Sequence, residues 1–117
     1  MMDSQQKDLH IVTGATKEDR YVAIRRLVES IPENKRIMGL FHDPMHAVNR
    51  VHQYPVDQFN HGGIKQIGSL MRLDADYIIV EPVTTKRDLD YLARCVELWD
   101  IAIIASVDIS IVSTDEC

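Results

Sequence analysis

The stretch that decides the fold runs from Gly62 to Thr85 and reads GGIKQIGSLMRLDADYIIVEPVTT. Its first half predicts an amphipathic helix, because its apolar residues recur at helical spacing; they are Ile64, Ile67, Leu70 and Met71. Asp74 and Asp76 end that helix. Tyr77–Val80 is a short, uninterrupted apolar run, as is typical of a strand covered on both faces. Ligands collect beyond the carboxyl ends of such strands, so Glu81–Thr85, expected to be a loop, is the first place to look for function.

Outward from this stretch, three more apolar runs predict core strands, at Leu9–Thr13, Arg36–Phe41 and Ile101–Val107. The segment 47–59 lacks a clean period, and Pro55 makes it an edge element at best. Strands that alternate with helices predict an α/β fold: a three-layer sandwich with a mostly parallel sheet and helices on both faces. The length of 117 residues predicts a single domain.

Two helices are expected to separate these strands. The apolar face of the first consists of Ala23, Ile24, Leu27, Val28 and Ile31, and that of the second consists of Leu89, Leu92, Ala93, Val96 and Trp99. Each helix is preceded by a capping pattern in which a threonine is followed three residues later by an aspartate. The pairs are Thr16 with Asp19 and Thr85 with Asp88.

Composition excludes several classes of protein. A net charge of −5 argues against nucleic-acid binding, which needs clustered lysine and arginine. No apolar run approaches the roughly 20 residues that span a bilayer. Two cysteines, Cys95 and Cys117, do not form a disulfide framework, so a cytoplasmic protein is expected. The five histidines predict no metal site, because Pro44 interrupts the His42–His46 pair and His52 and His61 have no ligand at a recognised spacing.

The order of these features resembles the nucleotide-binding core of the ATPases that drive type II secretion and type IV pili. The helix ending Leu70-Met71-Arg72, the acids Asp74 and Asp76, and the strand Tyr77–Val80 match the region that precedes that family's Walker B site. Asp43-Pro44 matches part of its E-D-P motif, the segment 47–59 resembles the short hairpin that follows this motif, and 105–110 matches its S-T-L-H-T-N box. The resemblance covers about residues 9–110 and implies a truncated P-loop, RecA-like core.

The resemblance also implies that the phosphate-binding loop is degenerate. The Walker A motif needs a second glycine, a lysine for the phosphates and a hydroxyl for Mg²⁺. Gly14 is in place, whereas Asp19, Arg20 and Tyr21 occupy the other positions. A phosphate there would meet the acidic first turn of a helix that its own side chains already cap. An ordinary capped helix is therefore expected at this position.

The catalytic positions implied by the resemblance are altered as well. His42, beside the retained Asp43, stands where the family has the glutamate that acts on the attacking water. Pro82, which follows Glu81, stands where the family has its Walker B glutamate. Asp108 replaces the histidine of the last box. No catalytic residue is therefore assigned, and these positions are candidate remnants of a lost active site.

Three functions remain open at this point. The first is a non-catalytic, pseudo-ATPase domain that binds a protein partner, by resemblance a part of secretion or pilus machinery, or a second copy of itself. The second is a divergent domain that binds or hydrolyses ATP with Mg²⁺ through Arg20, His42 and Glu81. The loop has two cations, Lys17 and Arg20, beside two acids, which favours the first function over the second. The third is a flavodoxin-like or receiver-like domain, which the same alternation of strands and helices allows.

Overall fold

The computed structural model describes residues 9–42, 50–55, 75–99 and 101–109. The elements, in chain order, are β1 (Leu9–Gly14), α1 (Lys17–Glu29), β2 (Ile37–Phe41), β3 (His52–Pro55), β4 (Tyr77–Val83), α4 (Lys86–Trp99) and β5 (Ala102–Asp108). The helix expected from Ile64 to Met71 lies outside the described residues. So do Asp43, Asp74, His46, His61 and Cys117.

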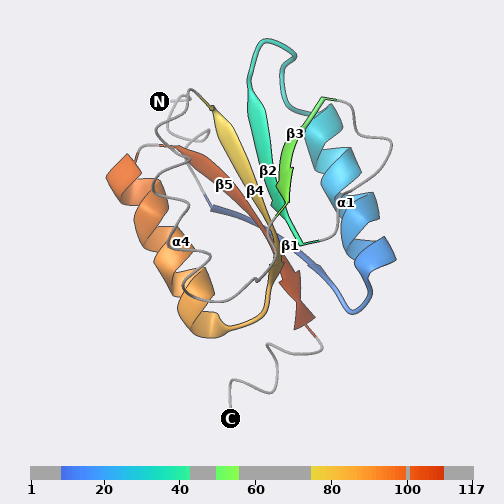
Figure 1. Cartoon of the computed structure of the whole chain (residues 1–117), viewed down its shortest axis with the longest axis vertical. Coiled ribbons are helices and arrows are strands. Elements are labelled where there is room, and N and C mark those ends of the chain that lie inside the picture. Colours follow the sequence, from blue (N-terminus) through green and yellow to red (C-terminus); the bar gives the residue numbers. More distant parts are fainter. Residues whose placement is uncertain (1–8, 43–49, 56–74, 100, 110–117) are drawn as a thin grey trace.

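The five strands form one sheet in the order β1-β5-β4-β2-β3, and every pair is parallel. Helices α1 and α4 lie on opposite sides of this sheet (Figure 1). The predicted three-layer α/β fold with a parallel sheet is therefore confirmed. In the flavodoxin-like order 2-1-3-4-5 the first strand is internal. Here β1 is an edge strand beside β5, so the sheet differs from the flavodoxin-like and receiver-like alternative.

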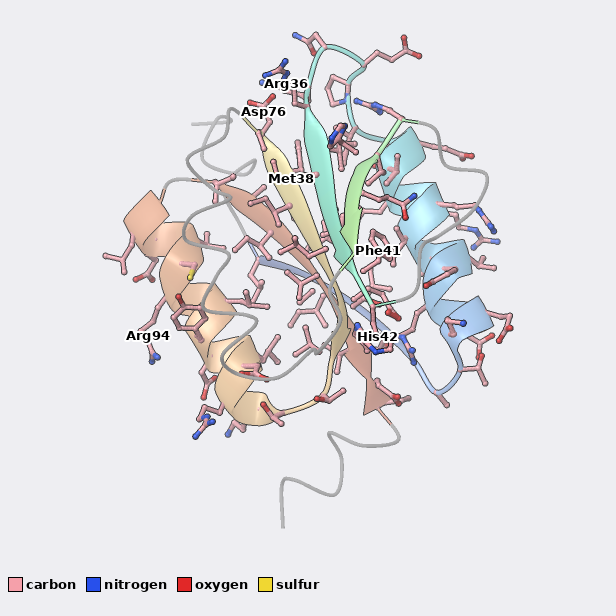
Figure 2. All side chains as sticks on the ribbon, in the orientation of Figure 1. Arg36, Met38, Phe41, His42, Asp76 and Arg94 are labelled. Carbon is pink, nitrogen blue, oxygen red and sulfur yellow. The ribbon has the colours of Figure 1, made fainter. Side chains whose placement is uncertain are left out.

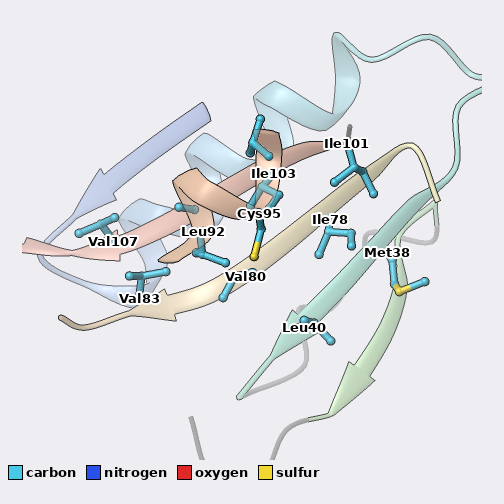
Figure 3. Packing of buried hydrophobic residues seen from close by; sticks show 12 residues of the cluster. Met38, Leu40, Ile78, Val80, Val83, Leu92, Cys95, Ile101, Ile103 and Val107 are labelled. Carbon is cyan, nitrogen blue, oxygen red and sulfur yellow. The ribbon is translucent and has the colours of Figure 1, made fainter. Parts of the chain in front are cut away.

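The core consists of two apolar layers, one on each face of the sheet. On one face, alternate residues of the central strands pack against Leu92 and Cys95 of α4 (Figure 3). On the other face, the intervening residues pack against Ile24 and Val28 of α1. Ile78, Ile79, Ile103 and Ile104 have no exposed surface. Burial on both faces explains why these strands are continuous apolar runs rather than alternating ones.

Three expectations from the sequence need correction. The expected loop Glu81–Thr85 is shorter than predicted, because β4 continues to Val83 through a register shift after Val80 and only Thr84 and Thr85 lie between β4 and α4. The described part of segment 47–59 is an edge strand as expected, but β3 pairs parallel with β2, whereas a hairpin would be antiparallel. On α4, Ala93 is exposed and Cys95 is buried in its place.

The starts of β2 and β4 are joined by Asp76. Its carboxylate accepts a hydrogen bond from the Arg36 backbone N–H at 2.8 Å, and its own N–H donates to the Arg36 carbonyl at 2.9 Å. Figure 2 shows Arg36 and Asp76 at one end of the sheet and His42 at the opposite end. This pairing fixes the register that brings Phe41 opposite Glu81 at the carboxyl edge.

Candidate functional site

The carboxyl ends of β1, β5 and β4 bring three predicted site residues to one edge of the sheet. Gly14 pairs in register with Asp108, and Glu81 lies on β4, the neighbour of β5. In parallel α/β sheets this is the edge where ligands bind. The candidate site is therefore built around these strand ends and the start of α1, which follows β1 directly.

Helix α1 begins with the cap that the sequence predicts. Thr16 has extended backbone angles, and its hydroxyl accepts a hydrogen bond from the Asp19 N–H at 3.1 Å. Glu18 and Asp19 place two acids in the first turn, where the helix dipole favours negative charge. Thr85 caps α4 in the same way, accepting from the Asp88 N–H at 3.1 Å. Both capping predictions are confirmed for the threonine hydroxyls.

Gly14 is required by the close approach of α1 to the end of β1. A Cβ at this position would lie 2.9 Å from Cγ of Arg20 and 3.0 Å from Cβ of Asp19. Contacts this short force a neighbouring atom to move. The glycine thus lets the Arg20 side chain pass close to the turn that joins β1 to α1.

Arg20 is the centre of the site, and it is buried, with 5% of its surface exposed. Its Nε donates to Oε2 of Glu81 at 3.1 Å, and its Nη1 donates to the carbonyl of Gly14 at 3.1 Å. The same Nη1 lies 3.7 Å from Oδ2 of Asp108. One guanidinium therefore joins the ends of β1, β4 and β5.

Glu81 is the most deeply buried charged side chain of this group, at 2% exposed. Burial raises the pKa of its carboxyl above the ordinary value of 4.5, although Arg20 and, to a smaller extent, Lys17 act in the opposite direction. The loss of hydration therefore outweighs the attraction of the guanidinium, as is common for buried ion pairs. Asp108 adds to the rise through like charge.

This raised pKa predicts how stability depends on pH. We expect the stability advantage of the wild type over Glu81→Gln to shrink as the pH rises from about 4 to about 7. Folding favours protonated Glu81, so its contribution is complete below the ordinary pKa of 4.5 and is lost as the pH rises through the folded pKa. Urea denaturation of both proteins across this range measures the difference.

The control for this measurement is Glu97→Gln, which changes an exposed carboxylate on α4 and should track the wild type. A stability gap between wild type and Glu81→Gln that widened with pH would contradict the prediction. It would mean that Arg20 lowers the pKa of Glu81 by more than burial raises it.

The remaining predicted site residues do not converge on this group in the same way. Tyr21 turns its ring toward the core, in an edge-on contact with Phe41 whose ring centroids lie 6.0 Å apart. His42 is exposed, and its backbone N–H donates to the Glu81 carbonyl at 3.1 Å. Pro82 lies within β4, after a cis peptide bond from Glu81. No cluster of potential metal ligands occurs among the described residues.

The pairing of Arg20 with Glu81 was missed from the sequence, although a signal for it was present. Arg20 precedes Ile24 and Val28 by four and eight residues, which places it on the buried face of α1. Glu81 follows Tyr77 and Ile79 at intervals of two, on the face of β4 that α1 covers. The helical period of α1 and the period of two in β4 therefore place Arg20 and Glu81 on facing sides of the two elements.

Comparison with known proteins gives information about the fold. No protein-family profile matches the sequence, and no curated protein aligns with it. Among solved structures, the VirB11 ATPase from the Brucella suis type IV secretion system, determined in complex with sulphate, has a similar structure with a TM-score of 0.63. The fold of this chain is similar to part of this ATPase. The match covers 91% of this chain and 32% of that ATPase at 13% sequence identity, so it establishes the fold alone.

Part of the expected resemblance is thereby confirmed. The sequence predicted a sheet like that of the secretion ATPases, and the VirB11 ATPase has a similar structure. The degenerate motifs at Gly14, Asp19, Arg20 and Tyr21 and at His42, Glu81, Pro82 and Asp108 remain a prediction. Within the described part of the chain, no helix is long and apolar enough to cross a membrane.

Proposed function

We propose that this chain is a non-catalytic, ATPase-like domain that acts through protein contacts. The observation that carries the proposal is the internal pairing of Arg20. Its guanidinium binds Glu81 and the Gly14 carbonyl and lies close to Asp108, all within the protein. By the secretion-ATPase resemblance, Arg20 stands where a catalytic lysine would meet the phosphates, and here its charge is directed inward.

The electrostatics of the loop support the same proposal. A triphosphate needs compensating positive charge, and the helix N-terminus that would supply part of it already carries Glu18 and Asp19. Opening the site to phosphate would require Arg20 to leave Glu81, which would then be a buried carboxylate without its cation. Protein binding by the ATPase-like scaffold needs neither additional positive charge nor the separation of Arg20 from Glu81.

The partner class follows from the resemblance and is part of the proposal. The structurally similar VirB11 ATPase belongs to a type IV secretion system. By analogy, a cytoplasmic component of secretion or pilus machinery is the kind of partner that this domain would bind. The alternative is a divergent domain that still binds or hydrolyses ATP, and a nucleotide titration separates the two.

We expect Mg-ATP to leave the melting temperature almost unchanged and to release no phosphate. A Kd weaker than about 1 mM corresponds to less than about 4 kcal/mol of binding free energy. At an ATP concentration of about one fifth of that value, linkage adds at most ~0.1 kcal/mol of stability, which shifts the melting temperature by less than about 1 °C. Differential scanning fluorimetry with ATP and ADP, alongside a phosphate-release assay, measures both expectations.

Two variants identify the source of any positive result. A rise of several degrees with ATP that Lys17→Ala abolishes would overturn the proposal in favour of a nucleotide-binding domain. Phosphate release that His42→Ala abolishes would overturn it in favour of a divergent ATPase. Both side chains are exposed, so neither substitution is expected to disturb the core.

A further inference from the structure

Strand β1 is an edge of the sheet. It pairs with β5 on one side, and no other described strand pairs with it. Ile11, near the middle of the strand, is 53% exposed. An edge strand offers a row of backbone N–H and C=O groups that can pair with another chain, and proteins usually protect such edges with charges, prolines or bulges. β1, with the sequence LHIVTG, has none of these.

The edge of β1 continues into an open groove of about 730 Å³ between β1 and α1. The residues of α1 and its C-cap that line the groove are Asp19, Val22, Ala23, Arg26, Leu27 and Ser30. Their spacing of three and four places them along one side of the helix. Val22 is 46% exposed, so this side of α1 and the edge of β1 form one partly apolar surface.

The charges of this surface are arranged so that the surface is complementary to itself. Asp19 and Arg26 are both exposed and lie about two helical turns apart, with Val22 and Ala23 between them. Two copies of the helix, placed antiparallel with Val22 at the centre, would set each Asp19 opposite the Arg26 of the other copy. A twofold axis produces this arrangement, because it brings the same surface together from both copies.

We propose that a second copy of this chain binds here, with the two β1 strands paired antiparallel across a twofold axis. The two sheets then become one continuous sheet, with the exposed Ile11 of each copy near the axis. Paired strands lie about 4.8 Å apart. Because α1 contacts both β1 and β5, the same axis brings the two α1 helices to roughly the 8–10 Å at which helices pack.

A second copy fits this surface better than an unrelated extended peptide. A peptide could pair with the backbone edge of β1, but it would have to supply an acid opposite Arg26 and a base opposite Asp19 at the right separation. A second copy supplies both at once. The proposal rests on the edge and its charges, and it requires neither the presence nor the absence of nucleotide binding.

The test is a charge exchange, read by analytical ultracentrifugation from about 1 μM to about 500 μM protein. The wild type should dimerise as its concentration rises. Asp19→Arg and Arg26→Asp should each weaken the dimer at least about tenfold, because each sets like charges opposite one another twice. The double variant, with both substitutions, should recover affinity to within about threefold of the wild type. An equimolar mixture of the two single variants should form a heterodimer.

Controls separate this surface from general effects of charge and folding. Arg25→Asp changes the net charge as Arg26→Asp does, but Arg25 does not line the groove, so its dimer should match the wild type. Ile11→Lys should abolish the dimer while circular dichroism shows the native fold. Each variant is compared by circular dichroism before the affinities are read.

Three results would overturn the proposal. They are a wild type that stays monomeric throughout, a dimer that survives both single charge reversals, and a double variant that is no better than either single one. A dimer that survives both charge reversals would place the interface on another surface. If the chain is monomeric and binds a different protein at the groove, that protein is the occupant. If the wild type stays monomeric and also fails to bind ATP, the proposed dimer is wrong but the proposed function stands.

Discussion

Arg20→Ala is expected to lower the free energy of unfolding by about 3–5 kcal/mol at neutral pH, the usual result of removing one partner of a buried ion pair. The substitution leaves Glu81, which is 2% exposed, without the cation that it accepts from at 3.1 Å. It also removes the donor to the Gly14 carbonyl and the charge beside Asp108. Urea denaturation followed by circular dichroism measures the loss.

The matched control is Arg25→Ala on the same helix, where the side chain is exposed and the change should stay within about 0.5 kcal/mol. A second comparison replaces both partners, Arg20→Met together with Glu81→Leu. Apolar replacements of a buried pair are often neutral, so the double variant should be more stable than Arg20→Ala. A loss below about 1 kcal/mol for Arg20→Ala would contradict the prediction, because exposed pairs have effects of that size.

The ion pair also connects the carboxyl ends of three strands from within the protein. In the proposed function, the strand ends keep their arrangement because Arg20 of α1 binds β1 and β4 directly and lies beside the acid of β5. Burial raises the pKa of Glu81 even though Arg20 acts in the opposite direction, so the loss of hydration outweighs the attraction within this pair. Its benefit is geometric, since it fixes where three strands and a helix meet.

The sheet could be predicted from the sequence because its strands are buried on both faces. Runs such as Tyr77–Val80 and Ile101–Val107 carry this signal locally, and both lie in the observed strands or at their ends. The end of β4 could not be found in the same way. Glu81 and Pro82 are typical of a loop, and only the arginine 61 residues earlier makes a buried carboxylate acceptable at that position.

In the candidate site, too, features set by neighbouring residues could be predicted, whereas features set by residues distant in the sequence could not. The caps at Thr16 and Thr85 depend on residues three positions away, so their spacing predicted them. The inward direction of Arg20 depends on a partner from β4 and was missed. Sequence patterns thus gave the position of the candidate residues and the start of the helix, whereas the pairing between elements needed the structure.

Arg50 is the clearest case of a contact without a local sequence signal. It lies just before β3, and its guanidinium reaches the last turn of α1 and the segment that follows. Nη1 donates to the carbonyls of Val28 at 3.0 Å and Ile31 at 2.7 Å. Nη2 donates to the carbonyl of Pro32 and, at 3.3 Å, to that of Lys35. The Val28 carbonyl lies in the last turn of α1, the negative end of the helix dipole, where a cation is stabilising, and the other three carbonyls lie in the segment that follows the helix.

Arg50→Ala is therefore expected to destabilise the protein by about 2–3 kcal/mol, because hydrogen bonds from a charged donor are each worth about 1.5–3 kcal/mol and are not additive. Arg50→Lys should recover only part of the loss, since an ammonium group keeps the charge but lacks the planar fork. Arg94→Ala, on the exposed side of α4, is the control and should change stability by less than about 0.5 kcal/mol. Urea denaturation gives the free energies, and hydrogen exchange should show faster opening of the last turn of α1. Full recovery by lysine would mean that the charge at the helix end, rather than the fork, provides the stabilisation.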